Sequence, residues 1–230
     1  MMLEGEFMRV KAVLFDLYGT LIYVENEVSD EEASEFLFSR GYEISPQQLN
    51  AAWYFVTMVD YPKYGYADLD SFLMQMFWRL GVEVDKETFR KFKELCKKRR
   101  QKLYPEVEEV LSKVKDHGFK TAIVTTTAHF FFKETLRPIE KYFDFICTGY
   151  EAGCDKSNPK IYIKVLDVLN IKPEEAVVIG DNLQYDVLLP KKLGMHAILL
   201  DRKGGKRKQA SNVVAKDLRE AIEMLLNRFK

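Results

Sequence analysis

The sequence predicts an α/β protein: a parallel five-stranded sheet with helices on both faces, plus an inserted helical cap domain. Two observations lead to this prediction. Five short apolar runs, rich in β-branched residues, alternate with segments of helical pattern, which is typical of an open parallel sheet. The long stretch between the first and second runs carries only helical patterns, so it is expected to be an insertion into the sheet domain.

The five predicted strands are almost continuously apolar, as is typical of strands that are buried on both faces of a parallel sheet. They cover residues 10–17, 120–127, 143–149, 175–181 and 196–201. The predicted core helices cover residues 104–118, 129–143, 158–171 and 217–229. Pro105 near the start and Gly118 at the end of the first of these helices match the residue preferences of helix termini. This alternation predicts a Rossmann-like core.

The predicted cap comprises residues 24–102, which leaves residues 1–23 and 103–230 for the α/β core. Ser29, followed by acidic residues, predicts a helix N-terminus in the cap. Residues 61–66 are interpreted as a loop that could contact a substrate. Large aromatic residues of the cap are interpreted as the core of a small helical bundle, above all Trp53, Phe55, Phe72 and Trp78.

The amino-acid composition restricts the kinds of binding partner that we expect for this chain. The chain holds 35 Lys and Arg and 35 Asp and Glu residues, and a net charge of zero argues against a dedicated nucleic-acid binder. The basic runs 97–100 and 202–208 are interpreted as solvated surface. Three cysteines without CxxC spacing indicate reduced thiols in the cytoplasm. We find no signal peptide and no segment that could span a membrane, and expect a monomer or homodimer with a small-molecule substrate.

Polar residues follow the predicted strands at the edge where an open parallel sheet binds ligands. The set comprises Asp16, Thr125–Thr127, Lys156, Asp181, Asn182 and Asp186. Any one of these residues alone has an ordinary structural explanation, such as a cap, a turn or β-propensity. Their occurrence together, at the ends of successive strands, indicates a catalytic site.

The chemistry of this set fits the transfer of a phosphoryl group. Asp16 can act as a nucleophile. At ~3.5 Å and an effective dielectric near 20, each pair of like charges costs roughly 5 kcal/mol, so such a site needs cations. Asp16, Asp181 and Asp186 together suit Mg²⁺, a hard cation that prefers oxygen ligands. Lys156 supplies a further positive charge, and the Thr125 hydroxyl can hold a phosphoryl oxygen. Gly19 allows a tight turn whose amide N–H groups face an anion.

Four segments resemble, in order, the motifs of the haloacid dehalogenase superfamily, whose members are mostly phosphatases. They are FDLYGTL, AIVTTT, DKSNPKIY and VVIGDNLQYD, and the resemblance runs from about residue 9 to residue 201. The helical insertion after the first motif resembles the C1-type cap of that superfamily.

The resemblance implies roles for individual residues. The implied catalytic residues are Asp16, Tyr18, Thr125 and Lys156. The implied substrate-binding residues are Gly19, Thr20, Thr126 and Asn182. The implied Mg²⁺ ligands are Asp16, the backbone carbonyl of Tyr18, Asp181 and Asp186. Together they imply a phosphatase that works on a small phosphorylated metabolite through a phospho-aspartate at Asp16.

Tyr18 departs from the phosphatase pattern, in which a second Asp acts as general acid and base. With a reference pKa near 10, tyrosine is a weaker proton donor there. We expect slow turnover or substrates with good leaving groups. Tyr18 and Tyr162 instead resemble the metal-free 2-haloacid dehalogenases, which form an ester at the nucleophile. Asp181 and Leu183 replace a Ser and an Asn of that pattern, and Arg40 is a candidate for binding a haloacid carboxylate only by rough position.

Three interpretations therefore stay open: a Mg²⁺-dependent phosphatase, which we favour, a dehalogenase, and a catalytically silent binding or regulatory protein. Asp181 favours the first, because another carboxylate beside the nucleophile requires a cation. Pro190 follows Asp186 within a predicted helix, so we expect it in a first helical turn or at a kink.

Overall fold

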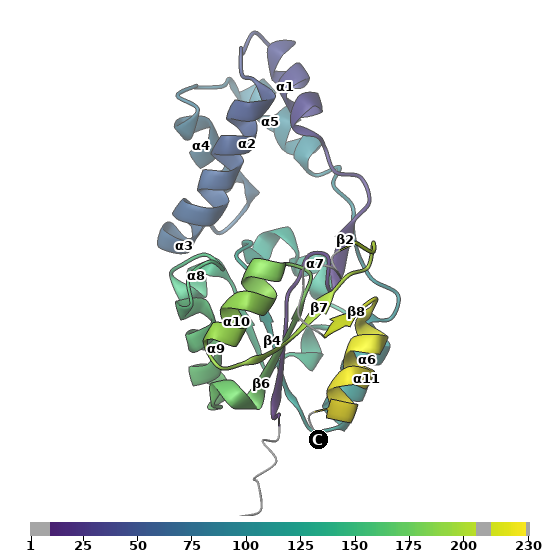
Figure 1. Cartoon of the computed structure of the whole chain (residues 1–230). Helices are drawn as coiled ribbons and strands as arrows, with labels where there is room; N and C mark the ends of the chain where they lie inside the picture. The colour runs from purple at the N-terminus through teal and green to yellow at the C-terminus, as the bar shows by residue number, and fades with distance from the viewer. Residues whose placement is uncertain (1–9, 206–212, 229–230) are drawn as a thin grey trace, which may run out of the picture.

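The computed structural model describes residues 10–205 and 213–228 of the chain (Figure 1). Its centre is a parallel sheet with the strand order β5-β4-β1-β6-β7-β8. The strands are β1 (Ala12–Phe15), β4 (Lys120–Val124), β5 (Phe145–Cys147), β6 (Ala176–Gly180), β7 (His196–Leu200) and β8 (Val214–Ala215). The predicted α/β fold is confirmed, but the sheet has six strands rather than five. β8 was missed because two residues carry no recognisable pattern.

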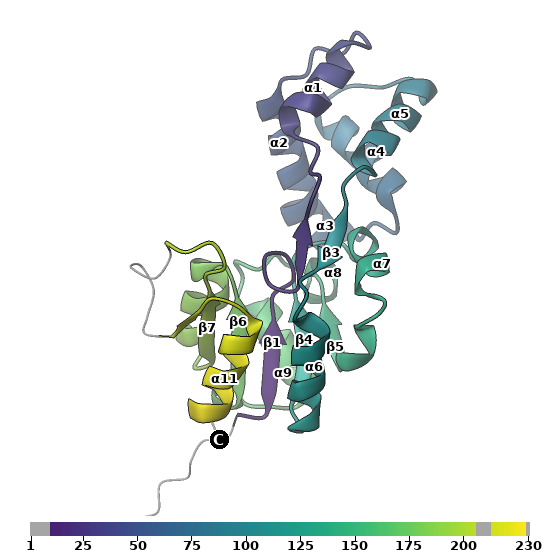
Figure 2. The same cartoon turned by 90° about the vertical axis from the view of Figure 1, so that its right-hand side faces the viewer.

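Helices cover both faces of the sheet, as Figure 2 shows. One apolar core joins the sheet to α6 (Val107–Asp116), α7 (Lys133–Leu136) and α11 (Leu218–Arg228). The other joins it to α9 (Lys160–Leu169) and α10 (Leu189–Lys192), next to the short α8 (Gly149–Ala152). The expected helix over residues 129–143 is wrong. Pro138 has no N–H to continue the helix, and the segment breaks into α7 and two 3₁₀ turns, His129–Phe131 and Glu140–Tyr142.

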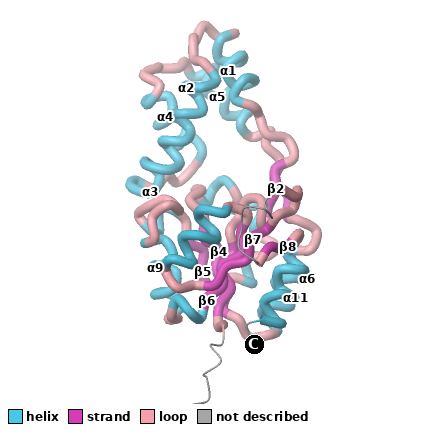
Figure 3. Tube along the Cα trace, in the orientation of Figure 1, coloured by secondary structure: helices cyan, strands magenta, loops and turns pink. Residues whose placement is uncertain are grey.

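Residues 24–102 form mainly helices that lie beyond one end of the sheet (Figure 3). Ser29 caps the first of them as predicted, since its side chain accepts a hydrogen bond from the Glu32 N–H. The helices are α1 (Asp30–Phe38), α2 (Pro46–Phe55), the π-helix η1 (Val56–Asp60), α3 (Tyr61–Tyr64), α4 (Leu69–Arg79) and α5 (Lys86–Cys96). Residues 61–64 are therefore helical and not the expected loop, because Pro62 occupies a first-turn position that needs no N–H partner.

The aromatic residues of the cap divide between interior and surface. Phe72 is fully buried, and the Trp53 ring lies 4.8 Å from it, so these two belong to the cap core as predicted. Phe55 is 47% exposed and Trp78 is 71% exposed, which corrects the interpretation of both as core residues. Trp78 projects from the side of α4 opposite to its buried residues, and helical periodicity alone did not show which side that would be.

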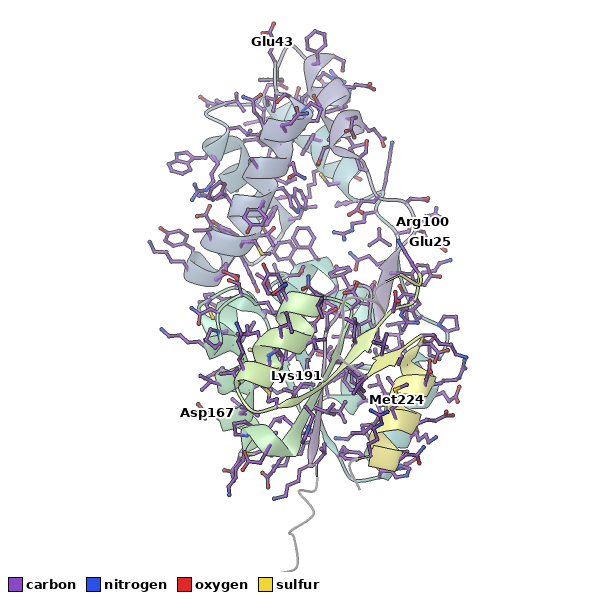
Figure 4. All side chains as sticks on the ribbon, viewed as in Figure 1. Glu25, Glu43, Arg100, Asp167, Lys191 and Met224 are labelled. Carbon is purple, nitrogen blue, oxygen red and sulfur yellow. The ribbon has the colours of Figure 1, made fainter. Side chains whose placement is uncertain are left out.

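Two hydrogen-bonded contacts join the helical segment to the sheet region, beside the packing of Phe130 and Phe131 against the cap core. The first is an antiparallel ribbon of β2 (Ile22–Val24) and β3 (Gln101–Leu103), which was not predicted. It continues into a hydrogen bond from the Glu25 N–H to the Arg100 carbonyl, and the two residues lie together in Figure 4. The second is a hydrogen bond between the Tyr61 and Thr148 hydroxyls, 2.9 Å long and buried. Among the described residues, no helix is long and apolar enough to cross a membrane.

Candidate active site

The predicted site residues meet at the carboxyl ends of β1, β4 and β6. Asp16 directly follows β1, and its N–H donates to the Ile179 carbonyl of β6 at 2.9 Å. Thr125 directly follows β4, and its N–H donates to the Cys147 carbonyl of β5 at 3.0 Å. The hydrogen bonding of the sheet thus continues one residue beyond β1 and one residue beyond β4. It fixes the backbone of Asp16 and of Thr125, so both side chains start from rigid positions.

Lys156 lies between two carboxylates. Its Nζ is 2.5 Å from Asp16 Oδ1 and 2.6 Å from Asp186 Oδ1. The three side chains are almost withdrawn from solvent, with exposed fractions of 8% for Lys156, 13% for Asp16 and 0% for Asp186. Burial alone would lower the pKa of Lys156, but the two carboxylates outweigh it and raise that pKa, so the lysine is a permanent cation.

Burial raises the pKa of Asp16 to about 7, with further contributions from the Asp186 and Asp181 charges, while Lys156 acts in the opposite direction. The second carboxylate oxygen of Asp16 accepts a hydrogen bond from Thr20 Oγ1 at 3.0 Å. One lysine therefore does not neutralise this group of acids. With all side chains ionised, three carboxylates and one ammonium leave two negative charges.

A divalent cation fits this arrangement. Carboxylate oxygens of Asp16, Asp181 and Asp186 lie within 4.8 Å of one another. Two glycines make room for them: a Cβ on Gly19 would lie 2.8 Å from the Asp181 carboxylate, and one on Gly180 would lie 2.3 Å from that of Asp186. An all-oxygen set with unbalanced negative charge is the chemistry that Mg²⁺ prefers.

Asp186 is fixed in this cluster in spite of the nearby proline. It lies in the π-helix η5 (Leu183–Leu188), and Pro190 follows in the first turn of α10, as expected for a proline after a helix interruption. The Asn182 N–H donates to Asp186 Oδ2 at 2.9 Å. The Tyr162 hydroxyl lies 3.4 Å from Asp186 Oδ1 and donates to the Tyr185 carbonyl at 2.6 Å.

Several residues that are predicted to bind substrate also form hydrogen bonds that support their neighbours. Thr126 Oγ1 accepts a hydrogen bond from the Lys156 N–H at 3.0 Å. The Asn182 side chain accepts hydrogen bonds from the N–H groups of Gln184 and Tyr185 and caps η5. The Gly19 N–H donates to the Ile22 carbonyl at 2.8 Å, so this amide is engaged in the turn and not directed at an anion.

The Tyr18 side chain points toward the ribbon that leads to the cap. Its ring centroid is 5.0 Å from the Arg99 guanidinium carbon. Burial raises the pKa of the Tyr18 hydroxyl to about 12, while Arg99 and Gln101 lower it and Glu27 raises it. The groups that act on this hydroxyl thus belong to the ribbon and not to the carboxylate cluster, which leaves the phenol poorly placed as a proton donor.

Two arginines near the site were missed by the sequence analysis, which interpreted both basic runs as solvated surface. Arg99 lies over Tyr18, with a side chain that is 24% exposed. Arg202, 15% exposed, donates to the Gly19 and Thr20 carbonyls at 3.1 and 2.8 Å and pairs with Glu106. It ties the turn after Asp16 to the loop after β7. Residues 206–208 of the second run lie outside the described residues.

A cavity of about 510 Å³ lies among the helices of the cap, and its lining residues all belong to residues 27–99. Arg99, which covers Tyr18, lines it, and so does Trp53, whose ring is 5.6 Å from that of Phe131. Three acidic residues, Glu27, Asp30 and Glu31, also line the cavity. Arg40 does not line it and packs on Phe36 and near Glu87 at the end of α1.

Comparison with known proteins identifies the family of this chain. The family model of haloacid dehalogenase-like hydrolases matches residues 10–194. This match covers most of the chain, including all four motifs. The chain therefore belongs to the haloacid dehalogenase-like hydrolases, and it is a hydrolase.

Individual relatives are similar over nearly the full length. A protein of Caldanaerobacter subterraneus, named provisionally as the pyrophosphatase PpaX, is 28% identical over 83% of this chain and 81% of its own length. A phosphatase of this superfamily from Thermococcus onnurineus has a crystal structure that superposes with a TM-score of 0.64 and 26% identity, covering 96% of this chain and all of that one. The L-2-haloacid dehalogenase of Xanthobacter autotrophicus, at 20% identity and a TM-score of 0.64 over the same 96% of this chain and all of its own, shares the fold.

Proposed function

We propose that this protein is a Mg²⁺-dependent phosphatase that acts on a small phosphorylated metabolite through a phospho-aspartate at Asp16. The observation that carries the proposal is the charge of the site. Asp181 adds a third carboxylate beside Asp16 and Asp186, and Lys156 balances only one of them. A divalent cation would neutralise the remainder and allow a phosphate dianion to approach. The phosphatases among the relatives support this proposal.

In the proposed reaction a carboxylate oxygen of Asp16 attacks phosphorus. The P–O bond to the leaving group breaks, and the leaving oxygen takes its electron pair and then a proton. Water next attacks the phosphorus of the acyl phosphate, which releases inorganic phosphate and restores the Asp16 carboxylate. Lys156 and the Thr125 hydroxyl would hold phosphoryl oxygens. Asp16, Asp181, Asp186 and the Tyr18 carbonyl would hold Mg²⁺, which supplies charge neutralisation when bound.

Residues 24–102 would act as a cap over the core formed by 1–23 and 103–230, and the substrate would bind between them. The position of the Tyr18 hydroxyl, near Arg99 and away from the carboxylates, suits leaving groups that depart without strong acid catalysis. We therefore expect acyl or aryl phosphates to react faster than alkyl phosphates. A Tyr18→Asp variant should raise activity toward alkyl phosphates.

A dehalogenase that forms an ester at Asp16 is the second candidate, favoured by Tyr18 and by the contact of Tyr162 with Asp186. Against it stands the uncompensated charge, because the haloacid anion would enter a site that is already negative. A silent binding protein is the third candidate. The close contact of Asp16 with Lys156 argues against it, since such a buried charge pair is costly to maintain without a use.

The test is phosphate release from acetyl phosphate and p-nitrophenyl phosphate, with Mg²⁺ and with EDTA. We expect release that needs Mg²⁺ and falls at least about 1,000-fold in Asp16→Asn, because the nucleophile is lost. Circular dichroism should show that the variant is folded. Absence of release from the wild type with Mg²⁺ contradicts the proposal, and chloride production from 2-chloropropionate would then support the dehalogenase.

A further inference from the structure

We infer that Arg202 is a positioning residue for the Mg²⁺ site: it holds the turn after Asp16, and through this turn it sets the positions of two carboxylates. Arg202 lies in the loop after β7, outside the residues 10–194 that the family model matches. The inference rests on the proposed phosphatase function, because it concerns the metal that the reaction would use, and it adds a residue to that site.

The guanidinium of Arg202 donates to two successive carbonyls of the turn. Its Nε lies 3.1 Å from the Gly19 carbonyl oxygen, and one amino nitrogen lies 2.8 Å from that of Thr20. The N–H groups of the same two peptide units, those of Thr20 and Leu21, both donate to the Leu17 carbonyl. Each unit is therefore held at its N–H and at its carbonyl, which fixes the conformation of the turn.

The two residues that Arg202 holds each contact one of the proposed Mg²⁺ ligands. Thr20 is fully buried, and its Oγ1 donates to Asp16 Oδ2 at 3.0 Å. Gly19 passes so close to Asp181 that a Cβ on it would lie 2.8 Å from the carboxylate. A displaced turn would therefore move both carboxylates. Since Mg²⁺ requires a nearly ideal octahedral arrangement of ligands, such a displacement would weaken its binding.

Arg202 is itself fixed by an aromatic ring and a buried acid. Its guanidinium carbon lies 3.6 Å from the centroid of the Tyr104 ring, and its second amino nitrogen lies 2.7 Å from a Glu106 carboxylate oxygen. The side chains of this ion pair are 15% and 6% exposed. All three guanidinium nitrogens are thus used at once, in a planar arrangement that the ammonium of a lysine cannot reproduce.

A second arginine–glutamate pair in the same part of the molecule provides a matched control. Arg219 of α11 pairs with Glu109 of α6 at 2.7 Å, and the Arg219 side chain is 53% exposed. Its Nε and one amino nitrogen both donate to Glu109. Glu106 directly precedes α6, so both pairs join the last part of the chain to the same helix, but the Arg202 pair also includes the carbonyls of the turn.

The experiment measures the Kd of Mg²⁺ by calorimetry, at a temperature where circular dichroism shows every variant to be folded. The decisive variant is the double substitution Arg202→Gln and Glu106→Gln, which removes the arginine, leaves no unpaired carboxylate and keeps the net charge. We expect the Kd to rise about 10-fold or more, since loss of a group that orients metal ligands usually costs about 10- to 100-fold. The kcat for acetyl phosphate should fall by a similar factor, with KM nearly unchanged.

The single variants separate positioning from stability. Arg202→Gln alone leaves the Glu106 carboxylate buried without its partner, so the melting temperature should fall by about 6–20 °C. The double variant should recover much of this loss without recovering the affinity for Mg²⁺. Arg202→Lys, which keeps the charge, should show an intermediate Kd. Arg219→Gln should leave the Kd unchanged and lower the melting temperature by about 4 °C or less.

Other roles of Arg202 predict different results. A purely electrostatic role predicts tighter binding of Mg²⁺ in Arg202→Gln, because a positive charge is lost near the carboxylates, and no change in the double variant. A merely structural role predicts lower melting temperatures at an unchanged Kd. Either result overturns the inference, while release of phosphate by the wild type that depends on Mg²⁺ would leave the proposed function intact. A wild-type protein that binds no Mg²⁺ would overturn both.

Discussion

The carboxyl edge of the sheet and the cap-side region around Arg99 differ in how completely their buried polar groups are paired. At the sheet edge, Asp16, Lys156 and Asp186 are paired at 2.5–2.6 Å, and hydrogen bonds of the sheet hold Asp16 in place. On the cap side, the Arg99 Nε is buried without a hydrogen-bond partner among the described residues, and its guanidinium lies over the Tyr18 ring.

This difference separates two requirements of an enzyme. The chemical step needs groups whose positions are set before the substrate arrives, and a rigid sheet edge provides them. Recognition of one substrate among many needs groups that become paired only when that substrate binds. The loss of a partner then discriminates strongly against other molecules. The core edge matches the first requirement, and a partly paired group such as Arg99 is the kind of group that suits the second.

The largest effect is expected from a substitution that removes the ion pairs of Lys156 with Asp16 and Asp186 at the core edge. Lys156→Gln leaves Asp16 and Asp186 buried together without their cation. We expect kcat to fall about 1,000-fold and the metal-free protein to lose about 3–5 kcal/mol of unfolding free energy, the usual cost of removing one partner of a buried ion pair. The measurements are phosphate release and chemical denaturation in EDTA.

Mg²⁺ should recover part of this lost stability, because it replaces the missing positive charge. The rise in melting temperature on adding Mg²⁺ should therefore be larger for Lys156→Gln than for the wild type. Lys160→Gln, in the same segment but exposed, is the control and should behave like the wild type. An equal rise in both proteins would mean that Mg²⁺ does not bind next to Lys156.

A pH titration tests the core edge directly, because it measures how much burial and the neighbouring charges disfavour the ionised form of Asp16. The pKa of Asp16 is raised from 3.8 to about 7 in the folded protein, mainly by burial. The folded state therefore binds this proton more tightly than the unfolded state. In EDTA, the unfolding free energy should fall as the pH rises from about 4 to about 7, by at most ~4 kcal/mol.

The control for this titration is Asp16→Asn, which removes the group. The difference in melting temperature between the two proteins should change across this pH window and be constant above it. A difference that does not depend on pH would show that Asp16 titrates normally. Saturating Mg²⁺ should flatten the decline of the wild type, since a bound cation favours the ionised carboxylate.

The sequence was sufficient for the core edge because its chemistry follows from strand order. Parallel strands bring their carboxyl ends together, so residues at the ends of separate runs, such as Asp16 and Asp181, had to meet. Lys156 and Asp186 could be assigned from the motifs that they resemble. The turn at Gly19 was also recognised, although its amide N–H is used within the turn.

The cap side could not be predicted in the same way. In the run 97–100, composition does not tell which of four basic residues packs on Tyr18, because that depends on the path of the chain between α5 and β3. The ribbon itself has three residues in each strand, too few for a periodic pattern. Helical periodicity did not show which side of α4 would face solvent, so the sequence did not separate the exposed Trp78 from the packed Trp53.

The smallest expected effect concerns the contact between cap and core far from Arg99. Tyr61→Phe removes the buried hydrogen bond between the Tyr61 and Thr148 hydroxyls. Thr148 keeps a hydrogen bond to Glu151, so it is not left unpaired, and the loss should be about 1 kcal/mol or less in denaturation experiments. Tyr64→Phe, at a side chain that is 56% exposed, should show no change.

The kinetics of Tyr61→Phe distinguish closure of the cap from recognition of the substrate. This hydrogen bond holds α3 against the core and touches none of Asp16, Lys156 and Asp186, so its loss should change KM for acetyl phosphate and p-nitrophenyl phosphate by the same factor. If Tyr61→Phe altered the ratio between the two KM values, the position of the cap would determine specificity, and the core edge and the cap could not be treated as independent parts of the site.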